Sequence, residues 1–516
     1  MPSYLSPGVY MEEVSSGSKP IEGVGTAVCA FVGFAQQGPY NEPTLVTNWT
    51  QFTQTFGDFT EGAYLAHSVY GYFLNGGGAA YIVRIGGDQA QEADPVPAQV
   101  ELTAGSGDAA RPVLVVRFKE SGAKAGPALS VEVAEPSEPA EGTFKLVVKQ
   151  DGAEKEAFDN VTVKKGPRNV VTAVRQRSRL IVVEEAKGAG QLVPDQGEVA
   201  LPALAPPPAD SAPAQVSASQ YVGDSSDRTG FAGLEAIDEV TMVSVPDLMS
   251  AYRDGMLDLE GVKAVQLGMI AHCELMADRM AILDPPPRMN AQQIKDWRQE
   301  TAGYDSKYAV VYWPWVKVMD PLSGKAVHVP PSGHLAGVWA RNDATRGVHK
   351  APANEVVRGA ISLELNITRG EHDQLNPIGV NCIRAFPGQG IRVWGARTLS
   401  SDAEWRYINV RRLFNFVEES ILSGTNWVVF EPNDQKLWDS VKRTVTMFLR
   451  SVWRDGAIFG RVPDQAFFVK CDEENNPPSS RDQGILNVEI GIAPVKPAEF
   501  VVFRISQYAE GAGLEE

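Results

Sequence analysis

Cysteine is scarce in this sequence, and the few cysteines present form no recognisable framework. The 516 residues contain four, none in a Cys-x-x-Cys pair, at Cys29, Cys273, Cys382 and Cys471. A disulfide-stapled fold and a zinc knuckle both need closely spaced thiols, so the spacing argues against both. The simple interpretation is synthesis in a reducing compartment.

Long apolar runs are also missing. No stretch approaches the roughly 18 apolar residues that indicate a membrane-spanning helix. The opening stretch MPSYLSPGVYMEEV has no basic region followed by an apolar core, so it does not match a secretory signal. We therefore expect a protein that is cytoplasmic on synthesis, does not insert into membranes, and leaves the cell only if a particle carries it.

Positive charge is in deficit. The chain has 47 lysines and arginines against 64 acidic residues, a formal net charge of −17. This argues against nucleic acid as a main partner, because phosphate binding needs a basic field. The same charge fits a protein that must stay soluble until it assembles. The length allows two to four domains with sizeable cores.

Catalytic motifs are missing as well. Ser323–Ala326 resembles the end of a phosphate loop, but Met319 stands at the first glycine position and Ala326 replaces the magnesium-binding Ser or Thr. The six histidines include no His-Glu-x-x-His pair, and nothing in the sequence places His349 beside Cys382 as a nucleophilic pair. We predict no catalytic residue, no cofactor and no metal site.

Two aspartates keep one enzymatic alternative open. Asp247 and Asp284 each follow an apolar strand, and open α/β sheets bind ligands at the carboxyl ends of their strands. A strand-end turn or a helix cap explains the same pattern and is favoured. The alternative is a small-molecule-binding α/β enzyme with a crevice at these two residues.

The chain begins with a segment that predicts an extended arm, followed by an α/β segment. Residues 1–22 are rich in proline and poor in apolar side chains, so they either fray or are ordered by a partner. Val9, Tyr10 and Met11 are the predicted inter-subunit contacts of this arm. Residues 23–87 read strand, helix, helix, strand, which predicts the N-terminal part of a core α/β domain.

A change of composition follows near residue 88. Residues 88–191 carry short strand patterns and predict a β-rich inserted domain. Residues 192–223 are rich in proline and alanine and predict an extended linker. The inserted domain carries no recognisable motif, which favours a surface decoration.

Strands and helices then alternate over residues 224–345. The βαβαβ pattern predicts a parallel sheet with helices on both faces. Within this part, residues 327–358 are rich in turn signals. We expect a short helix around Leu335 and Trp339 that breaks at Arg341–Asp343, with Gly333 and Gly337 at turns or close backbone approaches. Residues 346–393 predict a segment that returns to the core.

The remainder divides into a C-terminal domain, residues 394–484, and closing strands with an arm, residues 485–516. A helix capped by Asn433 and running to about Arg454 has one apolar face. Its opposite face carries the cations Lys436, Arg443, Arg450 and Arg454. A solvated face is the ordinary interpretation of such a row. Strands are expected over 485–492 and 499–505, with Val488, Ile490, Val501 and Phe503 as inter-subunit contacts.

Six sequence motifs stand out together: Pro7–Tyr10, Pro331–Gly337, Gly347–Asn354, Trp394–Thr398, Tyr407–Arg412 and Phe430–Asn433. They resemble the motifs of one family, the contractile tail-sheath proteins of phage tails and phage-tail-like injection systems. The resemblance implies a multidomain α/β protomer with a β-rich inserted outer domain and extended N- and C-terminal arms. It also implies a structural protein rather than an enzyme.

The family resemblance further implies hexameric rings that stack helically around an inner tube and contract to drive that tube through a target envelope. The implied partners are other copies of the chain, the inner tube protein, and baseplate and terminator or cap proteins. The row of cations is the predicted inner-tube contact. An injection system is favoured over a phage tail, and a passive capsid or adhesin subunit is a further alternative.

Overall fold

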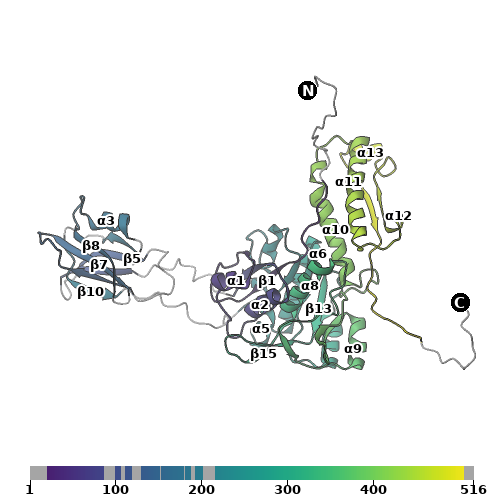
Figure 1. The fold of residues 1–516 in the computed structure, drawn as a ribbon, viewed down its shortest axis with the longest axis horizontal. Coiled ribbons are helices and arrows are strands. Elements are labelled where there is room, and N and C mark those ends of the chain that lie inside the picture. Colours follow the sequence, from purple (N-terminus) through teal and green to yellow (C-terminus); the bar gives the residue numbers. More distant parts are fainter. Residues whose placement is uncertain are drawn as a thin grey trace, which may run out of the picture. The chain divides into compact units, whose positions relative to one another are not determined.

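The computed structural model describes residues 20–86, 99–105, 111–118, 129–150, 153–178, 180–186, 192–200 and 216–504. The chain divides into two compact units (Figure 1). Unit 1 comprises Met1–Gly86 and Ser211–Glu516, and unit 2 comprises Gly87–Asp210. Unit 2 is therefore inserted in the sequence of unit 1. Among the described residues, no helix combines the length and the apolar character needed to cross a bilayer.

The centre of unit 1 is an eight-stranded sheet in the order β18-β17-β13-β12-β11-β1-β3-β2. The two edge strands are antiparallel to their neighbours, and all other pairs are parallel. The strands are β1 (Val28–Gly33), β2 (Thr44–Val46), β3 (Ala79–Arg84), β11 (Met242–Ser244), β12 (Met280–Leu283), β13 (Ala309–Trp313), β17 (Val380–Phe386) and β18 (Gly390–Val393).

The apolar runs of the sequence explain this sheet. Every residue of β11, β12 and β13 is buried, as expected for parallel strands covered on both faces. The predicted α/β fold, the parallel sheet, and the pairing of the first strand with that around Ile82 are confirmed. The helices of this part are α1 (Trp49–Phe56), α2 (Leu65–Asn75), α4 (Ala218–Val222), α5 (Leu248–Arg253), α6 (Leu259–Met276), α7 (Ala291–Asp296), α8 (Ser332–Arg346) and α9 (Arg369–Leu375), with short turns η4 (Ala232–Ala236), η5 (Trp297–Ala302) and η6 (Asn376–Ile378).

Helix α8 corrects the prediction for residues 327–358. The predicted break at Arg341–Asp343 is wrong, because the helix continues to Arg346 and most of its first ten residues are buried. The two glycines do mark close approaches. A Cβ on Gly333 would lie 2.4 Å from the Ser68 backbone, and one on Gly337 would lie 2.4 Å from the Tyr72 carbonyl oxygen. Small residues thus let α8 pack directly on the backbone of α2.

A small antiparallel sheet flanks the large one. Its strands are β14 (Val316–Met319), β15 (Ala326–Val329) and β16 (Ala360–Leu363). The turn between β14 and β15 holds Ser323–Ala326, the stretch that resembles a phosphate loop. There Asp320 accepts hydrogen bonds from the Ser323 backbone and hydroxyl at 3.2 and 2.5 Å, so the turn is closed on itself.

The last part of unit 1 is a helical subdomain with its own hydrophobic core. It contains α10 (Ile408–Gly424), η7 (Asn426–Val428), α11 (Gln435–Arg454), α12 (Pro463–Ala466), β19 (Phe467–Lys470), α13 (Pro478–Asp482) and β20 (Glu489–Ile492). The long predicted helix is confirmed, but its cap is Asp434, whose carboxylate accepts from the Leu437 amide at 2.9 Å. Asn433 instead accepts from the Trp438 indole.

Unit 2 has two antiparallel sheets around a separate core. One sheet has the order β10-β6-β7-β8 and the other β4-β5-β9. The strands are β4 (Gln99–Ala104), β5 (Arg111–Phe118), β6 (Leu129–Ala134), β7 (Thr143–Gln150), β8 (Ala153–Thr162), β9 (Ile181–Glu185) and β10 (Gly197–Ala200), with one helix, α3 (Val170–Arg177). Strand β10 and helix α4 both lie within the stretch expected to be an extended linker, so the ends of that stretch are structured. Residues 201–215 lie outside the described residues.

Candidate assembly surfaces

The row of four cations lies on the exposed side of α11, opposite the face that packs on the core. The apolar face buries Leu437, Val441, Val445, Phe448, Leu449 and Val452. The side chains of Lys436, Arg443, Arg450 and Arg454 are exposed, and within the described residues none of them forms an ion pair. Asp439 at the margin is likewise exposed. This basic row is therefore available to an acidic surface, and its assignment to the inner tube stays a prediction.

The closing strands are shorter than predicted. β20 begins at Glu489 rather than at Ile485, and among the described strands it pairs with β19. Val488 is half-buried just before the strand, and Ile490 lies within it at 36% exposure. A sheet of two strands is marginal by itself, because little apolar surface is covered and both outer edges lack partners. This small sheet is thus a candidate for added strands.

The expected strand over residues 499–505 is wrong for this chain by itself. Residues 499–504 are described and form no strand there. Val501 and Phe503 are 68% and 85% exposed, with Phe500 and Val502 similarly exposed beside them. Val9, Tyr10 and Met11 lie outside the described residues. Whether either arm pairs with a second copy stays a prediction.

Glu499 fixes the base of the C-terminal arm, and sequence reasoning missed this contact. Its carboxylate accepts two hydrogen bonds from Arg397, at 2.8 and 2.7 Å, one from Asn376 at 2.8 Å and one from Tyr407 at 2.9 Å. We call these four residues the arm clamp. Burial alone raises the pKa of Glu499, but the hydrogen bonds from Arg397, Asn376 and Tyr407 outweigh it, so the pKa is lowered.

The motif Tyr407–Arg412 contains Arg412, whose hydrogen bonds connect the helical subdomain to the sheet domain. Arg412 donates to both oxygens of Asp343 on α8, at 2.9 and 2.6 Å, and to the Thr26 carbonyl at 2.8 Å. The Thr26 hydroxyl donates to the same carboxylate at 2.7 Å. The guanidinium also lies 4.7 Å from the centre of the Trp339 ring. Both charged side chains are about 95% buried, so this pair is a structural junction rather than a binding site.

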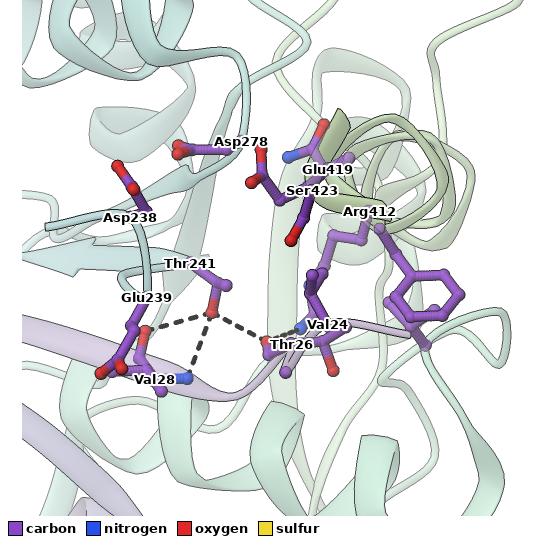
Figure 2. A pocket seen from close by; sticks show the side chains of 14 residues that line it. Val24, Thr26, Val28, Asp238, Glu239, Thr241, Asp278, Arg412, Glu419 and Ser423 are labelled. Atoms are coloured by element: carbon purple, nitrogen blue, oxygen red, sulfur yellow. Dashed lines mark hydrogen bonds between the residues drawn. The ribbon is translucent and has the colours of Figure 1, made fainter. Parts of the chain in front are cut away.

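A cavity of about 460 Å³ lies beside that junction (Figure 2). Helix α10 contributes Arg412, Glu419 and Ser423 to one wall, while Asp238 and Glu239 line the opposite side. Burial, Asp278 and Asp238 raise the pKa of Glu419. The acidic groups do not converge: among the described residues, no three His, Cys, Asp or Glu side chains are placed to hold a metal ion.

Asp247 occupies the position where an α/β enzyme would bind its ligand. The strand order reverses between β1 and β11, and such switch points with their helix N-termini attract anions. Here the Asp247 carboxylate fills that role. It accepts from the amides of Phe34 at 2.7 Å, Tyr64, and Leu65 at 3.2 Å. Burial raises its pKa to about 7, although these amides favour the charged form.

Asp284 is used in the same way at the next strand. Its carboxylate accepts from the amide and hydroxyl of Ser332, at 3.0 and 2.5 Å, at the start of α8. Burial raises its pKa to about 7 as well. The carboxylates of Asp247 and Asp284 therefore anchor helix N-termini, which is the helix-cap interpretation. Cys382 is fully buried, and burial raises its pKa to about 12, the opposite of an activated nucleophile.

Two family models match the chain in succession. The phage tail sheath protein central domain matches residues 229–399, and the phage tail sheath C-terminal domain matches residues 400–507. Together these stretches cover more than half of the chain. The fold above is thus that of a sheath-type structural protein. The chain belongs to the phage tail sheath family.

Curated relatives include the tail sheath protein of Burkholderia phage BcepMu, 22% identical over 524 residues, which cover 96% of this chain and 95% of the relative. The tail sheath protein of Vibrio phage KVP40 is 29% identical over 44% of this chain and 33% of the relative. A putative prophage major tail sheath protein of Pseudomonas aeruginosa is 29% identical over 44% of this chain and 57% of the relative. The matched region thus spans about a third of the KVP40 protein and just over half of the Pseudomonas aeruginosa protein.

Solved structures show the same fold over nearly the whole chain. The sheath complex of the extracellular contractile injection system PVC, in its contracted state, has a TM-score of 0.58 at 22% identity, covering 98% of this chain and 99% of that one. The contracted helical sheath of the anti-feeding prophage also has a TM-score of 0.58 at 22% identity, covering 97% and 99%.

Proposed function

We propose that this protein is the structural subunit of a contractile sheath. Copies form hexameric rings that stack helically around an inner tube, and the sheath shortens to drive that tube through a target envelope. A phage-tail-like injection system is favoured over a phage tail, and the support for this preference is that solved sheaths of two such systems share the fold over nearly the whole chain; coverage alone does not decide it, since a phage tail sheath protein matches a similar share of the chain in sequence. The further partners are baseplate and terminator or cap proteins, and the protein leaves the cell only within the assembled particle.

The observation that carries this proposal is the C-terminal arm. Beyond the arm clamp, Phe500, Val501, Val502 and Phe503 are each at least 68% exposed. Four consecutive apolar side chains in water are unfavourable, since burying each contributes about 1.5–3 kcal/mol. A partner that covers them is therefore expected. The two-stranded sheet β19–β20 of another copy offers such a partner, because an extended segment can be added to its open edge.

Contraction then requires no nucleotide. Strand-added arms keep neighbouring copies joined while their folded units rotate, and the extended lattice is a metastable state that relaxes to one with better contacts. This scheme is supported by Asp247 and Asp284, whose carboxylates are committed to the chain's own amides rather than open to a ligand.

The experiment that tests the function is electron microscopy of the protein co-expressed with its neighbouring tube gene, before and after acid or denaturant shock. Two helical forms, one long and narrow and one short and wide, are expected. A single lattice in all conditions would instead indicate a passive assembly, and the absence of any polymer would overturn the proposal.

The basic row on α11 is the proposed contact with the inner tube. Salt-sensitive contacts suit an interface that forms during assembly and separates on firing. Replacing Arg443 and Arg450 by Glu is expected to abolish tube-templated assembly while leaving the monomer folded. Lys442→Glu is the matched control, because it reverses a charge on the same helix about 100° away from Arg443. Sheaths of normal length from the double variant would refute this contact.

Unit 2 is proposed to lie on the outer surface of the sheath, where insertions of different size are tolerated. The proposal is supported by its separate hydrophobic core, which needs no contribution from unit 1. An antibody raised against unit 2 is expected to decorate assembled sheaths along their whole length. An epitope that is accessible only in the monomer would contradict this placement.

A further inference from the structure

The most exposed large apolar side chain of the described residues lies at a loop tip of the helical subdomain. Phe430, between η7 and α11, has a relative exposure of 102%, and its neighbour Val429 is 63% exposed. The backbone of Phe430 has φ +68°, a left-handed conformation that bulky residues rarely adopt. A fully hydrated aromatic ring at a strained position has no structural benefit within its own chain. Such features mark binding residues.

Hydrogen bonds at the base of the loop hold the tip in place. The Asn433 side chain accepts from the Trp438 indole at 2.7 Å and donates to the Ile485 carbonyl at 3.1 Å. The Glu431 amide closes a turn on the Val428 carbonyl at 3.2 Å. Because the base of the loop is fixed from both sides, the backbone that carries the ring is held at the tip. A fixed anchor loses little conformational entropy when it binds.

A hollow lies at the other end of the same helix. It has a volume of about 1200 Å³. Its lining combines the apolar side chains of Trp453, Ile458, Phe459 and Val495 with the polar side chains of Arg454, Arg461 and Gln465. Phe459 is 74% exposed. Figure 1 shows the two ends of α11: α13 lies near the start of the helix, and α12 lies near its end. Since α11 has 20 residues, the two features are separated by roughly 30 Å along its axis.

We propose that Phe430 of one copy inserts into this hollow of the next copy, with Glu431 placed opposite Arg461. Charge complementarity favours this occupant. An exposed carboxylate follows the aromatic ring on the tip, and Arg461, which forms no ion pair within the described residues, lines the hollow together with Phe459. Two different complementary patches at opposite ends of one domain generate a head-to-tail contact, and repeated copies then extend into rings or a helix.

This contact deepens the proposed function and rests on it only in that both need copies of the chain to associate. It differs from the arm contacts, because it joins two folded subdomains rather than an extended segment to a sheet. The basic row, which is proposed to face the inner tube, is a different surface of the same helix and shares one residue, Arg454, with the lining of the hollow. Aromatic anchors of this kind contribute a large share of the affinity of an interface.

The first test uses Phe430→Gly in the full-length chain. Glycine relieves the positive φ, so the folded monomer is expected to be at least as stable as the wild type. Self-association, measured by sedimentation velocity over a range of concentrations, is expected to weaken roughly ten-fold or more. Phe430→Trp is expected to retain it. The control Leu275→Ala removes another exposed apolar side chain, 71% exposed on α6, and should have no effect.

The second test identifies the occupant. Glu431→Arg and Arg461→Glu are each expected to weaken self-association, and the two changes in one chain are expected to restore it. A double variant no better than either single one would overturn the proposal and indicate that another protein, such as the inner tube, receives Phe430. Unchanged association of Phe430→Gly, or a wild type that stays monomeric at all concentrations, would also overturn it. A polymer with only one lattice contradicts the sheath function and leaves this contact standing, whereas a chain that never associates contradicts both.

Discussion

The junction between Arg412 and Asp343 allows a stringent test of how the helical subdomain is attached. Arg412→Ala removes two charge-assisted hydrogen bonds to Asp343, one hydrogen bond to the Thr26 carbonyl and the contact with the Trp339 ring. The remaining Asp343 side chain is about 95% buried, so its charge would lack compensation. Breaking a buried pair in this way costs about 3–5 kcal/mol. We expect a loss of unfolding free energy of that size.

Tryptophan fluorescence during urea denaturation measures this loss selectively. All ten tryptophans lie within unit 1, and unit 2 contains neither tryptophan nor tyrosine. The signal therefore reports the unit that contains the junction. Lys470→Ala is the control, because it breaks a solvent-screened surface pair with Glu474, a kind of pair that contributes little to stability.

A double-mutant cycle separates the pair from its surroundings. Arg412→Met with Asp343→Asn is expected to be less destabilising than the sum of the single changes, since neither buried charge is then left alone. A loss below about 1 kcal/mol for Arg412→Ala, or one equal to that of Lys470→Ala, would refute the role of the junction.

Three further outcomes follow from the same contacts. Gly337→Ala is expected to lower the free energy of unfolding, measured by urea denaturation, by roughly 1–3 kcal/mol, because the new Cβ would lie 2.4 Å from a backbone carbonyl oxygen. The control Gly370→Ala on α9, where the new Cβ has open space around it, should be neutral or slightly stabilising. Asp247→Ala should destabilise by several kcal/mol in the same assay, as three buried amides lose their acceptor, with Asp247→Asn less harmful. The pKa of Glu499 is lowered, so its ionised form stabilises the arm clamp at pH values above the ordinary Glu pKa, and this stabilisation is lost in more acidic solution. Proteolysis of the C-terminal arm should therefore become faster in acidic solution in the wild type. The variant Glu499→Gln has no carboxyl group to titrate and should not show this increase.

The sequence predicts the centre of the fold well because the buried residues there form patterns that can be recognised within a single strand or helix. The continuous apolar runs of β12 and β13 and the one-sided apolar face of α11 are local signals, and the structure confirms them. Helix α8 is different. Its predicted end lies at Arg341–Asp343, where asparagine and aspartate lower the local helical signal, but tertiary contacts continue the helix, since Arg341 donates to the Asn75 carbonyl and Asp343 binds Arg412.

The candidate surfaces divide in the same way. The basic row is visible from spacing alone, since a helix places residues seven apart on one side. The arm clamp is not, because Arg397 and Glu499 are 102 residues apart and only the folded chain brings them together. The strand expected at 499–505 fails for a related reason. A run of β-prone apolar residues forms a strand only when a neighbouring strand supplies ladder hydrogen bonds, and within the described chain residues 499–504 pair with no strand.

The arm clamp also determines where mechanical load enters the molecule. β20 pairs with β19 in the helical subdomain, but Glu499, seven residues after that strand, is bound by Arg397, Asn376 and Tyr407, which flank the large sheet. Tension applied to the arm beyond Glu499 therefore reaches the eight-stranded sheet domain first and bypasses β19 and β20. The stiffest part of the unit would carry the pull between neighbours, while the layer that carries α11 would remain unloaded.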